Sequence, residues 1–300
     1  MLMDSYEITS VQQVFDIVKR GSPLLDDLNK HIRDYDKIFP YGTWFRGQEA
    51  ADWPLVPSIF RRDKEKNEFI YAMDEPRLMH RFKLNLAKYR TELKDSFDWL
   101  SLMQHYRYPT RILDWTENIL VALYFAVVDK PETINKPGAL FVLNIFKLNH
   151  LTDPMATHLK PDDLPCWLRA QIAEDTSLDA IRHQVINGRP ADLPQLDKMI
   201  ADSKKDETNA AKLKKYFSRP LAVFPYHLHE RISRQQSTFI LHGGSYVKSE
   251  DFEPPILLEE LNNSIDQNLM FLKKFTIQPG DIKNKIRDQL RMVGIHEGSM

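Results

Sequence analysis

The segment from Gln104 to Val127, QHYRYPTRILDWTENILVALYFAV, places polar residues directly before an apolar block. The block, Ile119 to Val128, contains no charged residue. It is too short to cross a bilayer, because a spanning helix needs ~20 apolar residues. Since it is apolar on every side, we expect a helix that is buried all round rather than a surface helix with one apolar stripe. The fold must therefore enclose this helix and fix a polar cluster to its front end.

The composition is that of a globular protein, with 42% hydrophobic and 28% charged residues in a chain of 300. Forty-one basic residues balance forty-two acidic ones, so no overall field attracts nucleic acid or a membrane surface. Cys166 is the single cysteine, which excludes an internal disulfide and a multi-cysteine metal site. The first ten residues, MLMDSYEITS, lack a secretory pattern. We expect a cytoplasmic protein without a prosthetic group.

The periodicity of apolar residues predicts alternating helices and strands. Ser10 can cap an N-terminal helix within residues 1–21, with Gln13 reaching back as in a capping box. Further helices are predicted over 64–102, with Pro76 as a break or a new start, and from a cap at Asp281. Strands are predicted at TWFRGQ, RILDW, GALFVLNI, STFILH and KKFTIQP. Without a regular βαβ rhythm, the pattern favours an α+β fold with a mixed or antiparallel central sheet and flanking helices.

Residues 149–219 differ from the rest, because they are polar and interrupted by prolines. Their charges are of mixed sign, which favours a mostly helical insertion with solvated faces over a nucleic-acid tail. We therefore predict a single domain over residues 1–300 that contains this insertion.

Most familiar catalytic motifs are absent from the sequence: it has no phosphate-binding GxxxxGK[ST] loop, no GxGxxG, no HExxH and no GxSxG. His227 and His229, with Glu230 beside them, would need a third ligand from elsewhere to hold zinc. Ordinary strand or loop histidines are the simpler interpretation, and no metal site is predicted. Cys166 is interpreted as a packed, unreactive thiol.

Three polar clusters border the strongest core segments. The first is Arg46-Gly47-Gln48; the second runs from Gln104, His105 and Tyr106 to Arg111, Asp114 and Thr116; the third contains Arg231, Arg234, Gln235 and Gln236. Helix capping by Asp114 or Thr116, with Glu117 at capping-box distance from Asp114, explains part of the second cluster. Burying an unpaired arginine costs several kcal/mol, so arginines beside core segments imply facing acids or an anionic ligand. Asp114 can satisfy one arginine, and no obvious acid in the sequence satisfies the others.

The segments WFRGQ, WPLVPSIFR, QHYRYPTRILDWTENILVALYFAV and RISRQQSTFILHG together resemble the FRG domain family, named for a Phe-Arg-Gly motif. The resemblance covers about residues 40–245. Members of the family usually continue beyond a helix like 281–294, whereas this sequence ends at Met300, and many carry a small residue where Tyr108 stands.

The resemblance implies a bacterial or phage-related protein of unestablished activity, with some relatives resembling parts of defence or toxin systems. The order of motifs is also similar to an ADP-ribosyltransferase-like core, in which Arg46, Thr116 and Gln235 or Gln236 would be catalytic. Glu230 is the nearest carboxylate to that third position, where glutamine cannot accept a proton. The ligand contacts expected are Gln48, Gln104, His105, Tyr106, Arg111, Asp114 and Arg231.

On this interpretation a nucleotide-like small molecule binds a basic pocket, with NAD as a substrate for ADP-ribosyl transfer or glycohydrolysis and a macromolecule as a further target. The alternative is a non-catalytic module that senses a ligand or interacts with a partner. A purely structural polar network and a metal-dependent nuclease pair of Asp114 and Glu117 are the remaining interpretations.

Overall fold

The structure is a computed structural model of the chain that describes a defined set of its residues. These are 6–19, 22, 25, 28, 42–63, 65–66, 68, 70, 75–86, 96–152, 202, 206–208, 218–224, 236–244 and 255–299.

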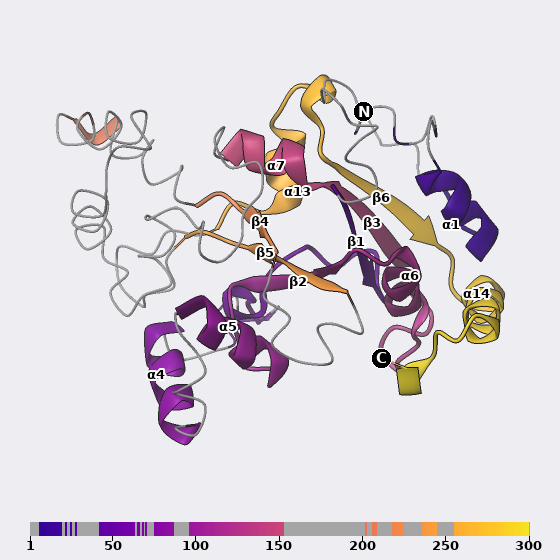
Figure 1. The fold of residues 1–300 in the computed structure, drawn as a ribbon, viewed down its shortest axis with the longest axis horizontal. Helices are drawn as coiled ribbons and strands as arrows, with labels where there is room; N and C mark the ends of the chain where they lie inside the picture. The colour runs from indigo at the N-terminus through magenta and orange to yellow at the C-terminus, as the bar shows by residue number, and fades with distance from the viewer. Residues whose placement is uncertain are drawn as a thin grey trace.

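A six-stranded sheet with the order β4-β5-β2-β1-β3-β6 forms the centre of the fold (Figure 1). Its strands are β1 Thr43–Gln48, β2 Ile112–Thr116, β3 Gly138–Asn144, β4 Leu221–Val223, β5 Ser237–Leu241 and β6 Leu272–Ile277. All neighbouring strands pair antiparallel, and a parallel bridge from Glu7 to Thr276 brings the N-terminal segment alongside β6. The predicted α+β class and the five predicted strands are confirmed, and the sheet is antiparallel.

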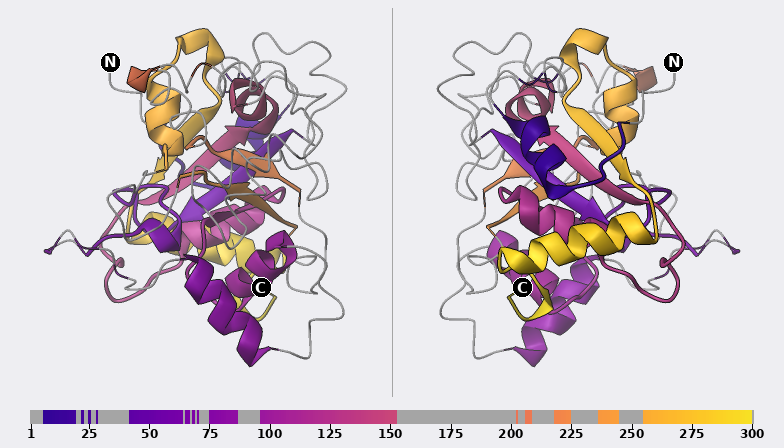
Figure 2. Two further views of the ribbon diagram at one scale, coloured as in Figure 1. Left: turned by 90° about the vertical axis from the view of Figure 1, so that its left-hand side faces the viewer. Right: turned by 90° about the vertical axis from the view of Figure 1, so that its right-hand side faces the viewer.

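Helices cover both faces of this sheet (Figures 1 and 2). They are α1 Val11–Val18, α4 Glu75–Asn85, α5 Ser96–His105, α6 Ile119–Val127, α7 Ile145–Thr152, α13 Leu258–Asn263 and α14 Asp281–Met292. One core cluster packs α1, α6 and α14 against the face that carries Phe45 and Val142. A second cluster packs α7 and α13 against the opposite face, which carries Trp44, Trp115 and Phe141. We call these the α6 face and the α13 face.

Helix α6 lies directly against the sheet because two glycines leave room for its backbone. A Cβ atom on Gly47 would lie 1.8 Å from the carbonyl oxygen of Ala122, and one on Gly138 would lie 2.0 Å from that of Ala126. The prediction of a helix buried all round holds for most of α6, but Phe125 is 36% exposed. The apolar block therefore has one partly exposed side.

The helix ends differ in detail from the sequence predictions. Asn118 caps α6, its side-chain oxygen accepting hydrogen bonds from the amides of Leu120 (3.0 Å) and Val121 (3.4 Å), so the predicted caps Asp114 and Thr116 are wrong. The N-cap of α14 is Gly280, and Asp281 is the first helical residue.

At α1, the Ser10 side chain accepts a hydrogen bond from the amide of Gln13, as predicted. The side-chain oxygen of Gln13 accepts a hydrogen bond from the amide of Thr9 (2.7 Å) rather than from that of Ser10.

The helical region predicted over 64–102 contains two helices, α4 and α5, and α4 begins at Glu75 next to Pro76. Most of the predicted insertion lies outside the described residues, so it stays a prediction, as does the single-domain organisation.

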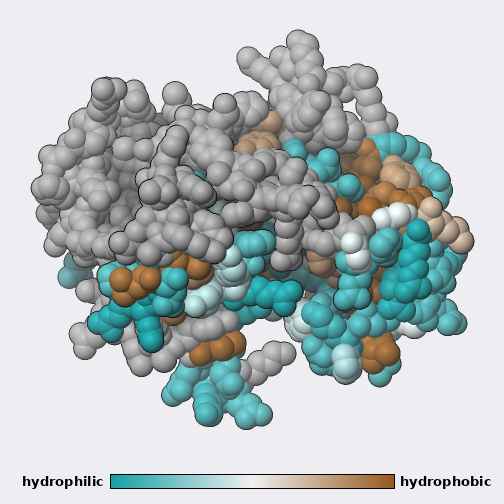
Figure 3. Space-filling view, turned by 60° about the horizontal axis from the view of Figure 1, so that its bottom comes forward, coloured by the Kyte–Doolittle hydropathy of each residue, from teal (hydrophilic) through white to brown (hydrophobic). Residues whose placement is uncertain are grey.

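None of the described helices has the length and apolar character needed to cross a membrane. Over the described residues, Figure 3 shows apolar side chains as separate patches on a largely hydrophilic surface.

Candidate functional site

Strands β1 and β2 are paired over only a short stretch and then separate. Their register contains the pair Phe45–Thr116, whereas β1 pairs with β3 along its whole length. Beyond that pair, the backbone groups of β2 need other partners. The guanidinium of Arg46 donates from Nη1 to the backbone oxygen of Asp114. The side chain of Arg46 thus bridges the gap between the two strands.

The segment WPLVPSIF, residues 53–60, forms hydrogen bonds to the residues just before β2, next to the same gap. The amide of Ile59 donates to the Thr110 carbonyl oxygen (3.2 Å), and the Ser58 hydroxyl accepts from the Thr110 amide (3.0 Å). Glu259 of α13 holds the start of this segment by accepting from the Leu55 amide (3.2 Å), and burial raises the pKa of the Glu259 carboxyl. Two motifs that are separate in the sequence therefore meet beside Arg46.

Arg46 carries a positive charge that no described carboxylate neutralises by direct contact. Burial lowers the pKa of Arg46 to about 10; Asp114 opposes this shift and Arg61 adds to it. The group stays protonated at neutral pH. Within the described part of the chain Arg46 forms no ion pair, and its buried Nε atom has no hydrogen-bond partner. An anion could therefore satisfy both the charge and the unused donor.

The carboxylate of Asp114 is engaged from the opposite side, by α5. Gln104 Nε2 donates to Asp114 Oδ2 (2.7 Å), and the Thr110 hydroxyl donates to Gln104 Oε1. The sequence suggested that Asp114 could satisfy an arginine, but among the described ion pairs it forms none. Its contact with Arg46 is through the backbone oxygen instead.

Arg111 has an acidic partner that sequence reasoning did not find. Its guanidinium is fully buried and lies 2.6 Å from a carboxylate oxygen of Glu75, with a second contact from Nε (2.7 Å). Nη1 donates to the carbonyl oxygens of His242 (3.3 Å) and Gly244 (3.1 Å). These contacts join α4, β2 and the end of β5, so Arg111 directs its donors at protein atoms rather than at solvent.

The α13 face around Arg46 carries further buried polar side chains. Alternate residues of a strand point to one face, which places Trp44, Arg46 and Gln48 of β1 together. Trp115 of β2 and its paired neighbour Thr238 of β5 lie on the same face. Within the described structure, each contributes a buried polar atom that lacks a hydrogen-bond partner: Trp44 Nε1, Arg46 Nε, Gln48 Oε1, Trp115 Nε1 and Thr238 Oγ1.

His242 extends this polar surface past the end of β5. It is fully buried, and its backbone amide donates to the Arg111 carbonyl oxygen (3.2 Å). Burial lowers the pKa of His242 to about 3; the backbone of Ile256 partly offsets the shift, and the charges of Arg111 and Arg46 add to it. The imidazole is therefore neutral at physiological pH.

Thr116 faces away from Arg46. It pairs with Phe45 and so lies on the α6 face, where its hydroxyl accepts from the Asn118 amide (3.0 Å). The ADP-ribosyltransferase-like interpretation expects Thr116 and Arg46 on the same side of the sheet. The structure places them on opposite sides.

The remaining predicted residues are only partly described. Glu230, Arg231 and Gln235 lie outside the described residues. Gln236 has a left-handed backbone (φ 46°), and its carbonyl oxygen accepts from the Glu117 amide (3.1 Å). The third cluster therefore begins next to the end of β2.

His105 and Tyr106 lie where α5 ends, just beyond Gln104. The Tyr106 ring is 45% exposed and packs at 5.9 Å from the Phe82 ring. Arg107, with φ 60°, is a further non-glycine residue in the left-handed region, a conformation that occurs often at functional sites. The turn around Arg107 fixes the end of the helix that presents Gln104.

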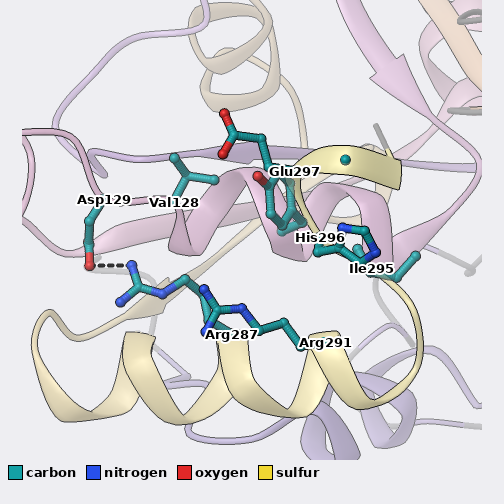
Figure 4. A pocket seen from close by; sticks show the side chains of 9 residues that line it. Val128, Asp129, Arg287, Arg291, Ile295, His296 and Glu297 are labelled. Carbon is teal, nitrogen blue, oxygen red and sulfur yellow. Dashed lines mark hydrogen bonds and ion pairs between the residues drawn. The ribbon is translucent and has the colours of Figure 1, made fainter.

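A hollow lies on the α6 side, between α6, α14 and the C-terminal turn (Figure 4). Its volume is about 560 Å³. The two arginines lining it already have acidic neighbours. Arg287 pairs with Asp129, and Arg291 with Asp288 (3.2 Å). The sequence predicted no site here, and we place the candidate site at Arg46 because its charge has no such neighbour in the described part of the chain.

Sequence reasoning missed Glu75, Trp115, Thr238 and His242. The last three lie inside the segments that carry the family resemblance. Trp115 and Thr238 are strand residues, and their neighbours along the strand point to the opposite face. Within the described residues, no group of three His, Cys, Asp or Glu side chains is arranged to hold a metal; His227, His229 and Glu230 lie outside them.

Residues 42–134 match the family model of the FRG domain. The match runs from the start of β1 past the end of α6, and it includes Arg46, Gln104 and Asp114. It confirms the resemblance to the FRG domain family over residues 42–134, whereas the predicted match of RISRQQSTFILHG stays a prediction. No curated protein and no solved structure matches the chain.

Proposed function

Because the chain carries an FRG domain, we propose that this domain binds a nucleotide or another phosphate-bearing ligand on the α13 face, at Arg46. The observation that carries the proposal is the partly buried, protonated guanidinium of Arg46, whose buried Nε atom and positive charge have no partner among the described residues. Native proteins rarely leave such a group uncompensated. A ligand anion would supply the missing charge.

The geometry of Arg46 is compatible with binding a phosphate group. Arg46 is anchored through Nη1 to the backbone of β2, which holds the planar guanidinium in place while Nε stays unused. A fixed guanidinium can bind phosphate oxygens through two parallel hydrogen bonds. Arg61 contributes positive charge to the same surroundings, and partial burial strengthens the attraction relative to water.

Two versions of this function differ in whether chemistry follows binding. The order of β1, Thr116 and the buried helix α6 supports NAD-dependent ADP-ribosyl transfer or NAD glycohydrolysis, as in a toxin or defence protein. The position of Thr116 on the opposite face, with its hydroxyl engaged by Asn118, supports a non-catalytic module that senses a ligand. We place binding first and treat turnover as the question that the experiment decides.

The test combines thermal stability with product analysis. Purified protein is incubated with inorganic phosphate, AMP or NAD, and the melting temperature and the products by mass spectrometry are recorded. A ligand at a hundred times its Kd stabilises by about 2.7 kcal/mol, which corresponds to a rise of roughly 5–10 °C for a chain of this size. We expect AMP or NAD to produce such a rise.

Two variants locate the effect. Arg46→Gln should abolish the rise, whereas Arg291→Ala, which removes an exposed arginine at the other hollow, should preserve it. A full rise in Arg46→Gln would contradict the proposal. Release of nicotinamide from NAD would identify an enzyme, and stabilisation without products would identify a binding module.

A further inference from the structure

The polar atoms around Arg46 differ in kind from those that would bind a bare anion. Trp115 Nε1 is a hydrogen-bond donor, Gln48 Oε1 an acceptor and Thr238 Oγ1 can be either. The three side chains are between 2% and 7% exposed. Buried polar atoms without partners reduce stability, and the great majority in native proteins are satisfied. Their concentration on one sheet face, beside an arginine that has no carboxylate partner among the described residues, therefore calls for a common explanation.

These atoms spread over an area larger than a phosphate. Trp115 is directly paired with Thr238, and Arg46 lies one strand beyond Trp115. Since paired strands lie about 4.8 Å apart and β1 and β2 separate beyond Phe45–Thr116, Arg46 and Thr238 are separated by roughly 10 Å or more at their backbones. Gln48 lies two residues along β1 from Arg46, or roughly 7 Å. A phosphate group contacts a region of only a few ångströms, so Arg46 and Thr238 would contact different parts of one ligand.

We infer that the ligand is a sugar phosphate of the nucleotide class, whose phosphate contacts Arg46 and whose uncharged sugar and base hydrogen-bond to Gln48, Trp115 and Thr238. This inference rests on the proposed function and specifies it. Hydroxyl and amino groups of a nucleoside supply donors for Gln48, and its ring and hydroxyl oxygens supply acceptors for Trp115.

If these polar atoms only stabilised the fold, Thr238→Val would lower the melting temperature and leave AMP binding unchanged, which is the opposite of what we expect. Removing the Thr238 hydroxyl by Thr238→Val keeps the shape of the side chain and removes a buried group without a partner. Thr152 is the matched control, because it is also fully buried but its hydroxyl donates to the Pro220 carbonyl oxygen (2.8 Å). Thr152→Val therefore removes a hydrogen bond that the fold uses.

The experiment is calorimetric titration of the full chain with inorganic phosphate, ribose 5-phosphate and AMP, with a thermal melt of each variant. We expect the wild type to bind AMP at least tenfold more tightly than phosphate, with ribose 5-phosphate in between. Thr238→Val should melt no lower than the wild type, lose about threefold to tenfold in AMP affinity, the equivalent of one hydrogen bond, and keep its phosphate affinity within twofold. Thr152→Val should melt lower and bind AMP normally.

The outcomes separate this inference from the proposed function. If phosphate and AMP bind equally well, and Arg46→Gln abolishes both, the anion site exists but the inference is overturned. Unchanged AMP affinity in both Thr238→Val and a second variant, Gln48→Met, would overturn it as well. If none of the three ligands binds, the proposed function itself fails.

Discussion

Gly47, the glycine of the Arg-Gly pair, is expected to be irreplaceable for steric reasons. In Gly47→Ala the new Cβ would lie 1.8 Å from the Ala122 carbonyl oxygen and 2.6 Å from the Ala126 amide nitrogen. Real Cβ contacts essentially never fall below 3.0 Å, so α6 would have to move by about 1.2 Å (3.0 minus 1.8 Å). The obstacle is the backbone of a buried helix, which cannot rotate away as a side chain can.

The loss of stability expected for Gly47→Ala follows from this displacement of α6. Overpacking relieved by side-chain shifts typically costs 1–3 kcal/mol, so displacement of α6 should cost about 3 kcal/mol or more. For a chain of this size, this lowers the melting temperature by roughly 6–12 °C. Urea unfolding followed by circular dichroism measures the free energy directly.

Gly298→Ala is the matched control, because the nearest atom to its Cβ, in His296, is 3.4 Å away. We expect that variant to unfold like the wild type. A free energy of unfolding for Gly47→Ala within about 1 kcal/mol of the wild type would refute the close approach of β1 and α6.

Three further predictions concern stability. Glu75→Gln removes the carboxylate that pairs with the buried Arg111 and should cost about 3–5 kcal/mol in urea unfolding; a double variant that also carries Arg111→Met should recover much of the loss, and no recovery would count against the ion pair. His242 has a folded pKa of about 3 against 6.5 unfolded, so only the unfolded state gains a proton as pH falls below 6.5, and stability falls with it. By pH 5 the loss amounts to about 2 kcal/mol, and His242→Gln should lack this part of the pH dependence in melts at pH 7 and pH 5; an unchanged slope would contradict the burial of a neutral imidazole. Asn118→Ala should cost about 1 kcal/mol through loss of the α6 cap, whereas Asp114→Asn should leave the cap intact, and equal losses in the two would contradict the capping assignment.

Local sequence patterns predicted most elements of the fold correctly. Apolar alternation and runs identified β1, β2, β3, β5 and β6, because these signals depend on neighbouring residues alone. The apolar block correctly indicated α6.

The candidate site was harder to predict, because it depends on contacts that the sequence does not display. Glu75 and Arg111 are 36 positions apart, so their pairing follows only from how α4 docks at the start of β2. Arg46 and Thr116 both lie at the ends of apolar segments, yet strand pairing directs them to opposite faces. Because faces alternate with each residue, this could be resolved only once the register Phe45–Thr116 was known.

The residue that caps α6 was also difficult to predict from the sequence alone. Asp114, Thr116 and Asn118 all have side chains that can cap a helix. The choice depends on where β2 ends, and pairing of Thr116 with Ser237 extends the strand to that residue. Asn118 is then the residue in position to cap α6.

The role of Arg46 as an anion-binding group is tested most directly by calorimetric titration of the wild type and Arg46→Lys with AMP. Lysine keeps the positive charge but loses the planar, two-pronged geometry. We expect AMP to bind the wild type and to bind Arg46→Lys at least tenfold more weakly, while the two proteins melt within a few degrees of each other. Equal affinities, or no binding of AMP to the wild type, would contradict it.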